Sequence, residues 1–510
     1  MSYFLAYDVG TSSVKSILVD LAGTIIASAI EEYPLHMPHP GWAEQEPLDY
    51  WNAVCKTTRK MVAEKQVAMS DIKGIAFTTQ GMGMIPVDKS GKVLHPNISW
   101  VDGRAEKQSR RIMNRFGGKK LIKLIVGVEL MGKDVIPKMI WLRENRPEIY
   151  NNTYKFLDVN GYLRYKCTGK MLTEWSGACS YSFSVKNKDW ERLFFKLTGV
   201  GTEKLPDLIR SVDEAGKLTA QAAHEMGLCE GISVYGGCDD TQSAALGTTA
   251  IDEGEAHIYV GTSAWVGVAT AKDRGFKNAA MTMQSADPAM NLVLGITESA
   301  GANTEWLLSA FYGHEKSTLQ PSALYELMEE EMKQTPPGAE YLIVTPWFLG
   351  ERCPVSSTTT RSTIFNLSHQ HTRGHIARAH FEGIAYNLRW TIENFEKDFG
   401  FTIRELKIAG GGCYNKTWMQ IIADITQRNI TTTSQPKNAG ALGAAMCAMV
   451  GSGTRQRFKE IEQLIQTTET YSANPENKDI YNLLFGKYKA VFRQLRKTYD
   501  GINGARFEIK

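Results

Sequence analysis

The chain has 510 residues, of which 43 % are hydrophobic and 22 % charged, and its formal net charge is +3. This length exceeds one ordinary hydrophobic core, so we expect two domains with the composition of a typical globular protein. The small net charge gives no general reason to expect nucleic acid or a membrane as a partner, and no apolar stretch is long enough to span a bilayer.

A strand, a tight turn and a second strand open the chain, around the segment Asp8–Lys15. Gly10 permits a backbone conformation that a side chain would obstruct. The amides of Gly10, Thr11 and Ser12, together with the Thr11 hydroxyl, can hold a phosphate. Asp8 at the mouth of the turn can hold Mg²⁺ through water. Taken alone, this turn could also be a plain hairpin.

A second copy of this turn lies about half the chain further on, where Val260–Ser263 again follows one apolar run and precedes another. A phosphate hairpin in each half suggests two related domains that face one nucleotide. We place the boundary near residues 247–254, which gives a first domain of residues 1–247 and a second of residues 248–510.

Several further strands are predicted to end in polar or glycine-rich loops, which is where open α/β sheets place their ligands. The strands are Ile72–Thr78, Ile232–Tyr235 and Leu406–Ala409, and the loops after them contain Gln80–Gly83, Gly236–Asp240 and Gly410–Gly412.

Helices alternate with these strands. We expect one from the cap Asp49 to about Glu64, a long amphipathic one over residues 373–398, one over Asn415–Arg428 and a small-residue helix at 439–445. This alternation predicts an α/β fold with mixed sheets. Neither a P-loop nor the Rossmann Gly-x-Gly-x-x-Gly pattern occurs, which disfavours both common nucleotide-binding folds.

A basic helical stretch runs from Lys107 to Lys123. Nucleic-acid binding is one interpretation, but aromatic residues are nearly absent, so a solvated helix face is favoured and we expect no nucleic-acid partner. The eight scattered cysteines indicate free thiols in a reducing compartment, and the first residues do not look like a signal peptide. A cytoplasmic location is the expectation.

Taken in order, these segments resemble the FGGY family of carbohydrate kinases, of the actin-like ATPase superfamily. The resemblance covers about nine-tenths of the chain. The matching motifs are Asp8-x-Gly-Thr-Ser-Ser-x-Lys15, Trp100-x-Asp102-Gly-Arg104, Pro137-Lys138-x-x-Trp141, Gly236-Gly-x-Asp239, Gly261-Thr-Ser263, Gly350-Glu-Arg352-x-Pro354, Gly410-Gly-Gly412 and Ala441-Leu-Gly-Ala-Ala445.

The resemblance implies two ribonuclease-H-like domains around a central cleft, with the sugar bound mainly by the first and ATP mainly by the second. Such a kinase needs a base near the sugar hydroxyl, Mg²⁺, and amides around the phosphates. The family match implies that Asp239 is the catalytic base. The alternative for Asp239 is a helix N-cap, a position that Asp240 could fill instead.

The resemblance also implies the binding residues. Candidates for the sugar are Gln80, Gly81, Met82, Trp100, Asp102, Arg104, Asp239 and Asp240. Candidates for ATP are Gly10, Thr11, Ser12, Lys15, Gly261, Thr262, Gly301, Glu305, Gly411, Gly412 and Asn415. Asp8 and Asp239 are the candidates for Mg²⁺. Asp240 stands where related kinases often carry Asn, and its carboxylate could raise the pKa of the base.

Within the family the chain is most similar to the xylulokinases, which implies transfer of the γ-phosphate of ATP to D-xylulose, giving the 5-phosphate. The segment Gln80–Gly83 departs from the Gln-Met-His-Gly of that group, so its usual sugar-site histidine is missing. Another ketose or a polyol such as erythritol or xylitol therefore stays as an alternative. A non-catalytic sugar sensor and an actin- or chaperone-like ATPase are rivals from other classes, and a homodimer is an option that the sequence leaves open.

Overall fold

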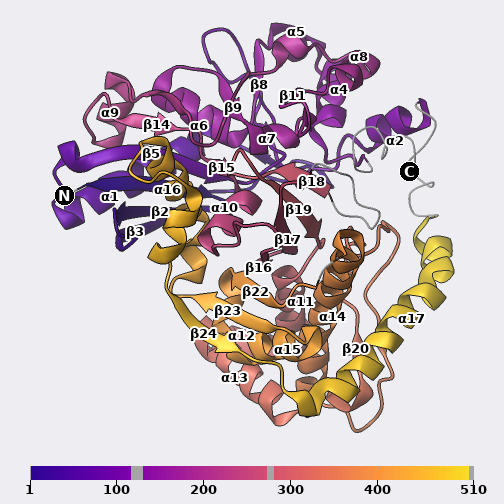
Figure 1. The fold of residues 1–510 in the computed structure, drawn as a ribbon. Coiled ribbons are helices and arrows are strands. Elements are labelled where there is room, and N and C mark those ends of the chain that lie inside the picture. The colour runs from indigo at the N-terminus through magenta and orange to yellow at the C-terminus, as the bar shows by residue number, and fades with distance from the viewer. Residues whose placement is uncertain (1, 116–129, 273–280, 401, 505–510) are drawn as a thin grey trace.

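The computed structural model describes residues 2–115, 130–272, 281–400 and 402–504 of the chain. Two lobes, each built on one large mixed sheet, lie against each other (Figure 1). The first part of the predicted basic stretch lies in helix α2 (Glu106–Arg115). Lys119, Lys120 and Lys123 of this stretch lie outside the described residues. Among the described helices, none is long and apolar enough to cross a membrane.

The N-terminal lobe contains a seven-stranded sheet. The strands β1, β2 and β3 form the predicted antiparallel meander, and β5 and β14 extend it as parallel neighbours of β1 and β5. Strand β13 closes the far edge in the antiparallel sense, and the short β15 pairs with the end of β5. The bounds are β1 Tyr3–Val9, β2 Ser13–Asp20, β3 Ile25–Glu32, β5 Ile72–Thr79, β13 Glu214–Lys217, β14 Ser233–Tyr235 and β15 Cys238–Asp239.

The C-terminal lobe repeats this arrangement. Strands β19, β17 and β16 are antiparallel, β22 and β23 continue in parallel from β16, and β24 closes the edge in the antiparallel sense. Strand β18 adds one more antiparallel strand beside β19. The duplication expected from the two hairpins is therefore confirmed in the sheet topology. The bounds are β16 Ala256–Val260, β17 Ala264–Thr270, β18 Met281–Gln284, β19 Asn291–Ile296, β22 Glu405–Ala409, β23 Asn429–Thr433 and β24 Thr467–Tyr471.

Five two-stranded sheets complete the strand content of the described residues. They pair β4 Glu44–Gln45 with β7 Asn97–Ile98, β6 Ile85–Val87 with β8 Lys155–Leu157, β9 Leu172–Glu174 with β12 Asp207–Ile209, β10 Phe183–Ser184 with β11 Asp189–Trp190, and β20 Ile343–Val344 with β21 Ile364–Phe365.

Helices cover the faces of both sheets. In the N-terminal lobe they are α1 Pro47–Lys65, α4 Val135–Asn145, α5 Pro147–Asn152, α6 Val159–Thr168, α7 Trp175–Cys179, α8 Arg192–Thr198, α9 Ala220–Met226 and α10 Asp240–Gly247. The later helices are α11 Gly301–Phe311, α12 Gly313–Thr318, α13 Pro321–Gln334, α14 Arg373–Phe399, α15 Lys416–Thr426, α16 Ala439–Gly451 and α17 Lys478–Gly504.

The start of α1 differs from the prediction. Asp49 was expected to cap this helix, but the helix begins at Pro47 after the cap residue Glu46, which places Asp49 in the first turn. Proline is well suited to the first helical position, because its missing N–H would have no partner there and its φ angle is already helical. The expectation that Asp49 is the N-cap is wrong.

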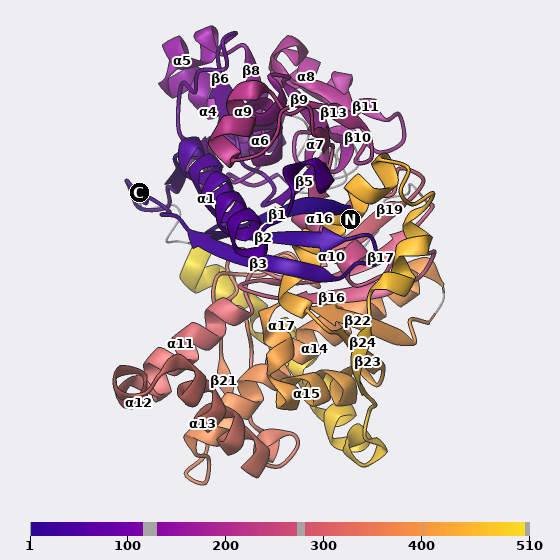
Figure 2. The ribbon, with the colours of Figure 1, turned by 90° about the vertical axis from the view of Figure 1, so that its left-hand side faces the viewer.

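Helices α10 and α16 cross between the lobes and pack on the sheet of the opposite half of the chain. Helix α1 covers one face of the N-terminal sheet (Figure 2), and α16 covers the other, beside β1 and β5 (Figure 1). Helix α10 packs on Leu292 and Leu294 of the C-terminal sheet. The two helices touch through glycines: a Cβ atom on Gly443 would lie 2.2 Å from the carbonyl oxygen of Ser243.

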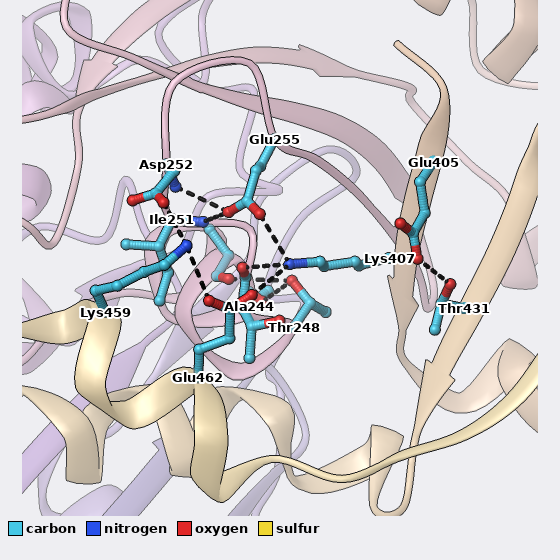
Figure 3. Close-up of polar contacts among 12 residues, drawn as sticks. Ala244, Thr248, Ile251, Asp252, Glu255, Glu405, Lys407, Thr431, Lys459 and Glu462 are labelled. Atoms are coloured by element: carbon cyan, nitrogen blue, oxygen red, sulfur yellow. Dashed lines mark hydrogen bonds and ion pairs between the residues drawn. The ribbon is translucent and has the colours of Figure 1, made fainter.

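A charged cluster holds the two connections between the lobes together (Figure 3). The Lys407 ammonium on β22 donates to the carbonyl of Thr249 at 2.7 Å and pairs with Glu255 at 3.2 Å and Glu462 at 3.3 Å. Thr249 and Glu255 belong to the connection after α10, whereas Glu462 lies on the return from α16 to β24. Lys459 adds ion pairs with Asp252 and Glu462. One lysine therefore ties both crossings to the C-terminal sheet.

Candidate functional site

The two predicted phosphate hairpins are the turns between β1 and β2 and between β16 and β17. In the first turn the Gly10 amide donates to the Ser13 carbonyl at 3.0 Å, and in the second the Gly261 amide donates to the Ser263 carbonyl at 2.9 Å. These two amides close their own turns. This differs from the expectation of a free Gly10 amide, and it gives both glycines the role of shaping the turn around Thr11 and Thr262.

Asp239 lies at the end of β15, which pairs with β5 at Thr79. It occupies the N-cap position of α10, yet its side chain makes no capping hydrogen bond. The side chain is 5 % exposed, and a Cβ atom on Gly81 would lie only 2.5 Å from its Oδ2 atom. Burial, followed by the negative charge of Asp240, raises the pKa of Asp239 well above its ordinary value. The carboxylate is thus fixed at the site without being used as a cap.

Two further carboxylates belong to this region: Asp240 acts on the pKa of Asp239, and Asp8 acts on the pKa of Asp240. Burial raises the pKa of Asp240 to about 6, and the charge of Asp8 adds to this effect. Lys15 balances part of the charge, because its ammonium lies 3.3 Å from Asp8 Oδ2. Helix α16 approaches from the other side, where a Cβ atom on Gly440 would lie 2.9 Å from the same oxygen.

These carboxylates are better suited to a Mg²⁺ ion that also binds water and substrate phosphates than to a metal ion held by protein ligands alone. Among the described residues no cluster of three or more acidic, histidine or cysteine side chains is arranged to hold a metal ion. Magnesium usually keeps several waters and takes one or two carboxylates together with substrate phosphates. Asp8 and Asp239 fit that donor set, with the hairpins beside them for the phosphates.

The loop after β5 is joined to the first hairpin by hydrogen bonds. The Thr11 hydroxyl donates to Gln80 Oε1 at 3.2 Å and accepts from the Trp100 indole at 2.9 Å. The Gln80 amide donates in turn to Gln45 at 2.9 Å. A pocket between this loop and Asp239 is lined by Gln80–Met82 and also reaches Glu174. The structure therefore brings Thr11, predicted for the phosphates, together with Gln80 and Trp100, predicted for the sugar.

Lys138 supports the same loop and had no assigned role beyond its motif. Its buried ammonium donates to the carbonyl of Met82 at 3.0 Å and to that of Ser99 at 2.8 Å. Met82 has a φ of +58°, a conformation that costs energy for a residue with a side chain. Burial lowers the pKa of Lys138 to about 7. Its place in the Pro-Lys-x-x-Trp motif was the only sequence signal for it.

Asp102 and Arg104, predicted to bind the sugar, pair with each other and contact the segment of residues 42–44. Both side chains are fully buried, and Arg104 Nη2 lies 2.7 Å from Asp102 Oδ2. The other contacts of Asp102 include the Ala43 amide, which donates to it at 2.6 Å. The Arg104 guanidinium lies over the rings of Trp42 and Trp141, 3.8 Å and 4.9 Å from their centroids. Of this motif, Trp100 alone has contacts that reach the phosphate hairpin.

Three of the glycines predicted to bind ATP, Gly301, Gly411 and Gly412, lie next to the second hairpin or to its strand β16. The Gly301 amide at the start of α11 donates to the Gly261 carbonyl at 2.9 Å, and a Cβ atom on Gly301 would lie 2.5 Å from that oxygen. Gly411 and Gly412 follow β22, the direct neighbour of β16. A Cβ atom on Gly411 would meet no atom within 4 Å, so the backbone there is open to a ligand.

Two other residues predicted to bind ATP, Asn415 and Glu305, already have side-chain partners. The Asn415 side-chain oxygen accepts from the Trp418 amide at 2.8 Å and so caps α15. Glu305 is exposed on α11 and forms an ion pair with Lys316. The capping bond uses only the side-chain oxygen of Asn415, so its NH₂ group can still donate to a ligand. Glu305 would have to exchange Lys316 for a ligand.

Two lobes of the same ribonuclease-H-like topology, each with a phosphate hairpin, and a buried carboxylate between them define a phosphotransferase with the actin-like ATPase fold. The model of the FGGY family of carbohydrate kinases matches with its N-terminal domain over residues 3–247 and with its C-terminal domain over residues 256–452. The chain belongs to the FGGY family of carbohydrate kinases and is a sugar phosphotransferase.

Known proteins are similar to this chain over its full length. The xylulose kinase of Bacillus subtilis (strain 168) is 30 % identical over 509 residues, which is 99 % of this chain and 100 % of that protein. The gluconokinase of the same strain is 23 % identical over 504 residues, 98 % of each chain. The crystal structure of a ligand-bound xylulose kinase from Lactobacillus acidophilus has a TM-score of 0.89 at 23 % identity, covering 98 % of this chain and 100 % of that one.

Proposed function

We propose that this enzyme transfers the γ-phosphate of ATP to a hydroxyl of a small neutral sugar, with D-xylulose as the first choice and D-xylulose 5-phosphate as its product. The observation that carries the proposal is the buried Asp239 carboxylate, which lies beside Gly81 of the loop after β5 and makes no capping hydrogen bond. The full-length similarity to a protein named xylulose kinase supports the choice of sugar.

In this mechanism Asp239 accepts the proton of the attacking hydroxyl, which needs a base within hydrogen-bonding reach. Thr11, Thr262 and the amides of their turns bind the phosphates. When bound at Asp8 and Asp239, Mg²⁺ would supply positive charge to the phosphate oxygens. We assign residues 1–247 to the sugar side of the cleft and residues 248–510 to the ATP side.

The charges around the site favour a neutral sugar over a sugar acid. The carboxylates of Asp8, Asp239 and Asp240 lie together, while Lys15 is paired with Asp8. Lys138 is occupied by two backbone carbonyls. A substrate carboxylate would therefore meet like charges and no free cation among the described residues of the pocket, which disfavours a gluconate-type substrate. A polyol is neutral too and stays the second candidate, because the usual sugar-site histidine is replaced.

The test is ADP release by the full chain with ATP and Mg²⁺ and a panel of pentuloses, hexuloses, pentitols, erythritol, glycerol and gluconate. We expect D-xylulose to give the highest rate and chelation of the metal to abolish it. Asp239→Asn should lower kcat by about 10²–10⁴-fold, since that is the usual contribution of a general base, while both substrates still bind in calorimetry. Normal turnover of the variant would refute the base, and a polyol-only or gluconate-only profile would refute the sugar.

A further inference from the structure

Glu174 lines the pocket beside Asp239, at the N-cap of α7, and accepts hydrogen bonds from three donors. Its Oε2 atom accepts from the Ser176 amide at 2.7 Å. Its Oε1 atom accepts from the Gly177 amide at 2.5 Å and from the Ser176 hydroxyl at 2.7 Å. The residue is 1 % exposed. A short helix of this kind needs a cap, but the third bond, from the hydroxyl, is more than a cap requires.

The third bond connects Glu174 to the base. Because the Ser176 hydroxyl gives its proton to Glu174, its oxygen lone pairs are left to accept, and the backbone amide of Asp239 donates to that oxygen at 2.9 Å. Ser176 is fully buried, so no water competes for this bond. A chain of hydrogen bonds thus runs from a buried carboxylate to the backbone of the residue that carries the base.

Asp239 is confined from several sides, and the hydrogen bonds through Ser176 confine it from one of them. Strand pairing with Thr79 fixes the backbone on the β5 side, and Gly81 leaves just enough room for the carboxylate on the pocket side. The Ser176 oxygen fixes the amide from the α7 side. Displacement of a catalytic group by about 1 Å can cost a hundredfold in rate, so the last of these contacts matters for turnover.

We propose that Glu174, acting through Ser176, is a positioning residue that holds Asp239 in place for phosphoryl transfer. The proposal rests on the proposed function, in which Asp239 is the base. Only a carboxylate satisfies this arrangement, because all three groups that face it are donors. The amide of Gln would turn its own N–H groups toward an amide N–H in either orientation. Burial raises the pKa of Glu174 to about 7, while the nearby Arg164 charge opposes that rise.

The experiment compares steady-state kinetics of Ser176→Ala and Glu174→Gln with those of the unmodified chain, using the sugar that gives turnover. We expect kcat to fall about ten- to a hundredfold in each variant, with KM for sugar and for ATP changed less than about threefold. The double variant should lose little more than the worse single variant, since both act through one chain of hydrogen bonds. Glu174→Asp, which keeps the charge and can still cap, should restore part of kcat relative to Gln.

Ser109→Ala is the matched control. Ser109 is also fully buried and its hydroxyl donates to a backbone carbonyl, that of Leu130, at 2.8 Å, and within the described part of the chain no hydrogen bond joins it to Asp239. It should lower the melting temperature to a similar extent as Ser176→Ala and leave kcat unchanged. An unaltered kcat in folded Ser176→Ala and Glu174→Gln, with Asp239→Asn inactive, would overturn the positioning role alone. An active Asp239→Asn would instead overturn the proposed function beneath it.

Discussion

The acidic side chains at the site differ in their surroundings, and these differences support the separate roles that we propose for them. Asp239 is buried, caps nothing and faces Gly81, which suits a base. Asp8 is paired with Lys15 and is proposed to hold Mg²⁺. Glu174 accepts hydrogen bonds from three donors, which suits a residue that holds other groups in place. Sequence alone could select Asp239 through its motif, but it could not separate these roles, because each depends on a partner distant in the chain.

A buried histidine makes the stability of the C-terminal lobe depend on pH. His380 on α14 is 1 % exposed, and burial lowers its pKa to about 4, compared with about 6.5 in an unfolded chain. The neutral form is favoured on folding, so the stabilisation is complete above pH 6.5 and is lost as the pH falls toward 4. The difference corresponds to about 3 kcal/mol.

We therefore expect the free energy of unfolding, measured with denaturant, to fall between pH 6.5 and pH 4. His380→Met, an apolar side chain of similar size, should remove about 3 kcal/mol of that fall, and the remaining slope should include the buried His257, whose pKa burial lowers to about 3. The exposed His224 on α9 offers the control, and His224→Gln should keep the slope of the unmodified chain. Equal slopes for His380→Met and the unmodified chain would contradict this prediction.

At the scale of elements, local sequence patterns were sufficient to predict individual strands and helices, but they did not predict which distant elements pack together. The opening meander and the long helix expected at 373–398, found at Arg373–Phe399, follow from alternation and helical periodicity, which are read within a few residues. The small-residue helix at 439–445 was also expected. The sheet on which this helix packs could not be predicted, because nothing within its 13 residues indicates contact with strands that lie more than 350 residues earlier in the chain. The burial of Asp102 and Arg104 could not be foreseen for the same reason, since Trp42 and Trp141 cover Arg104 from distant segments. Their contact with the sugar stays a prediction.

The contact between α10 and α16 depends on the absence of side chains. Gly443→Ala would place a Cβ atom 2.2 Å from the Ser243 carbonyl, so the helices must move apart. We expect a loss of about 1–3 kcal/mol in the free energy of unfolding, the usual cost of overpacking, measured by denaturant titration. Gly486→Ala on α17 is the matched control, because its Cβ would meet no atom within 4 Å, and it should stabilise by up to about 1 kcal/mol. Stabilisation by both variants would show that the helices are not in tight contact.

At the scale of the whole molecule, an ion pair between described residues joins the two lobes. The Lys133 ammonium, just before α4, lies 2.9 Å from both carboxylate oxygens of Glu298, just after β19. Arg352, from the Gly-Glu-Arg motif, donates to the same carboxylate at 2.9 Å. Lys133 and Glu298 are 17 % and 14 % exposed, so solvent screens the pair only partly. The lobes are thus held in this arrangement by a contact that opening must break.

Lys133→Met should therefore favour the open arrangement of the lobes. We expect the KM for the sugar to rise about fivefold to tenfold, because binding must then close the lobes without the ion pair. Small-angle scattering with sugar and a non-hydrolysable nucleotide should show a larger radius of gyration than for the unmodified chain. Lys217→Met is the control, since Lys217 pairs with Glu214 within one lobe. If Lys133→Met leaves KM and radius unchanged, the pair does not control closure.

The crossing of α16 has a consequence for how the protein is made. During synthesis the N-terminal sheet emerges first, but the helix that covers its second face is not complete until residue 451. By then the ribosome has made every strand of the C-terminal sheet except β24. The apolar side chains of Phe4, Ile17 and Val19, which pack against α16, therefore remain without this cover for most of translation. The two lobes therefore mature together at the end of synthesis, and a nascent or truncated first half is the form in which this chain is most exposed to aggregation and to chaperones.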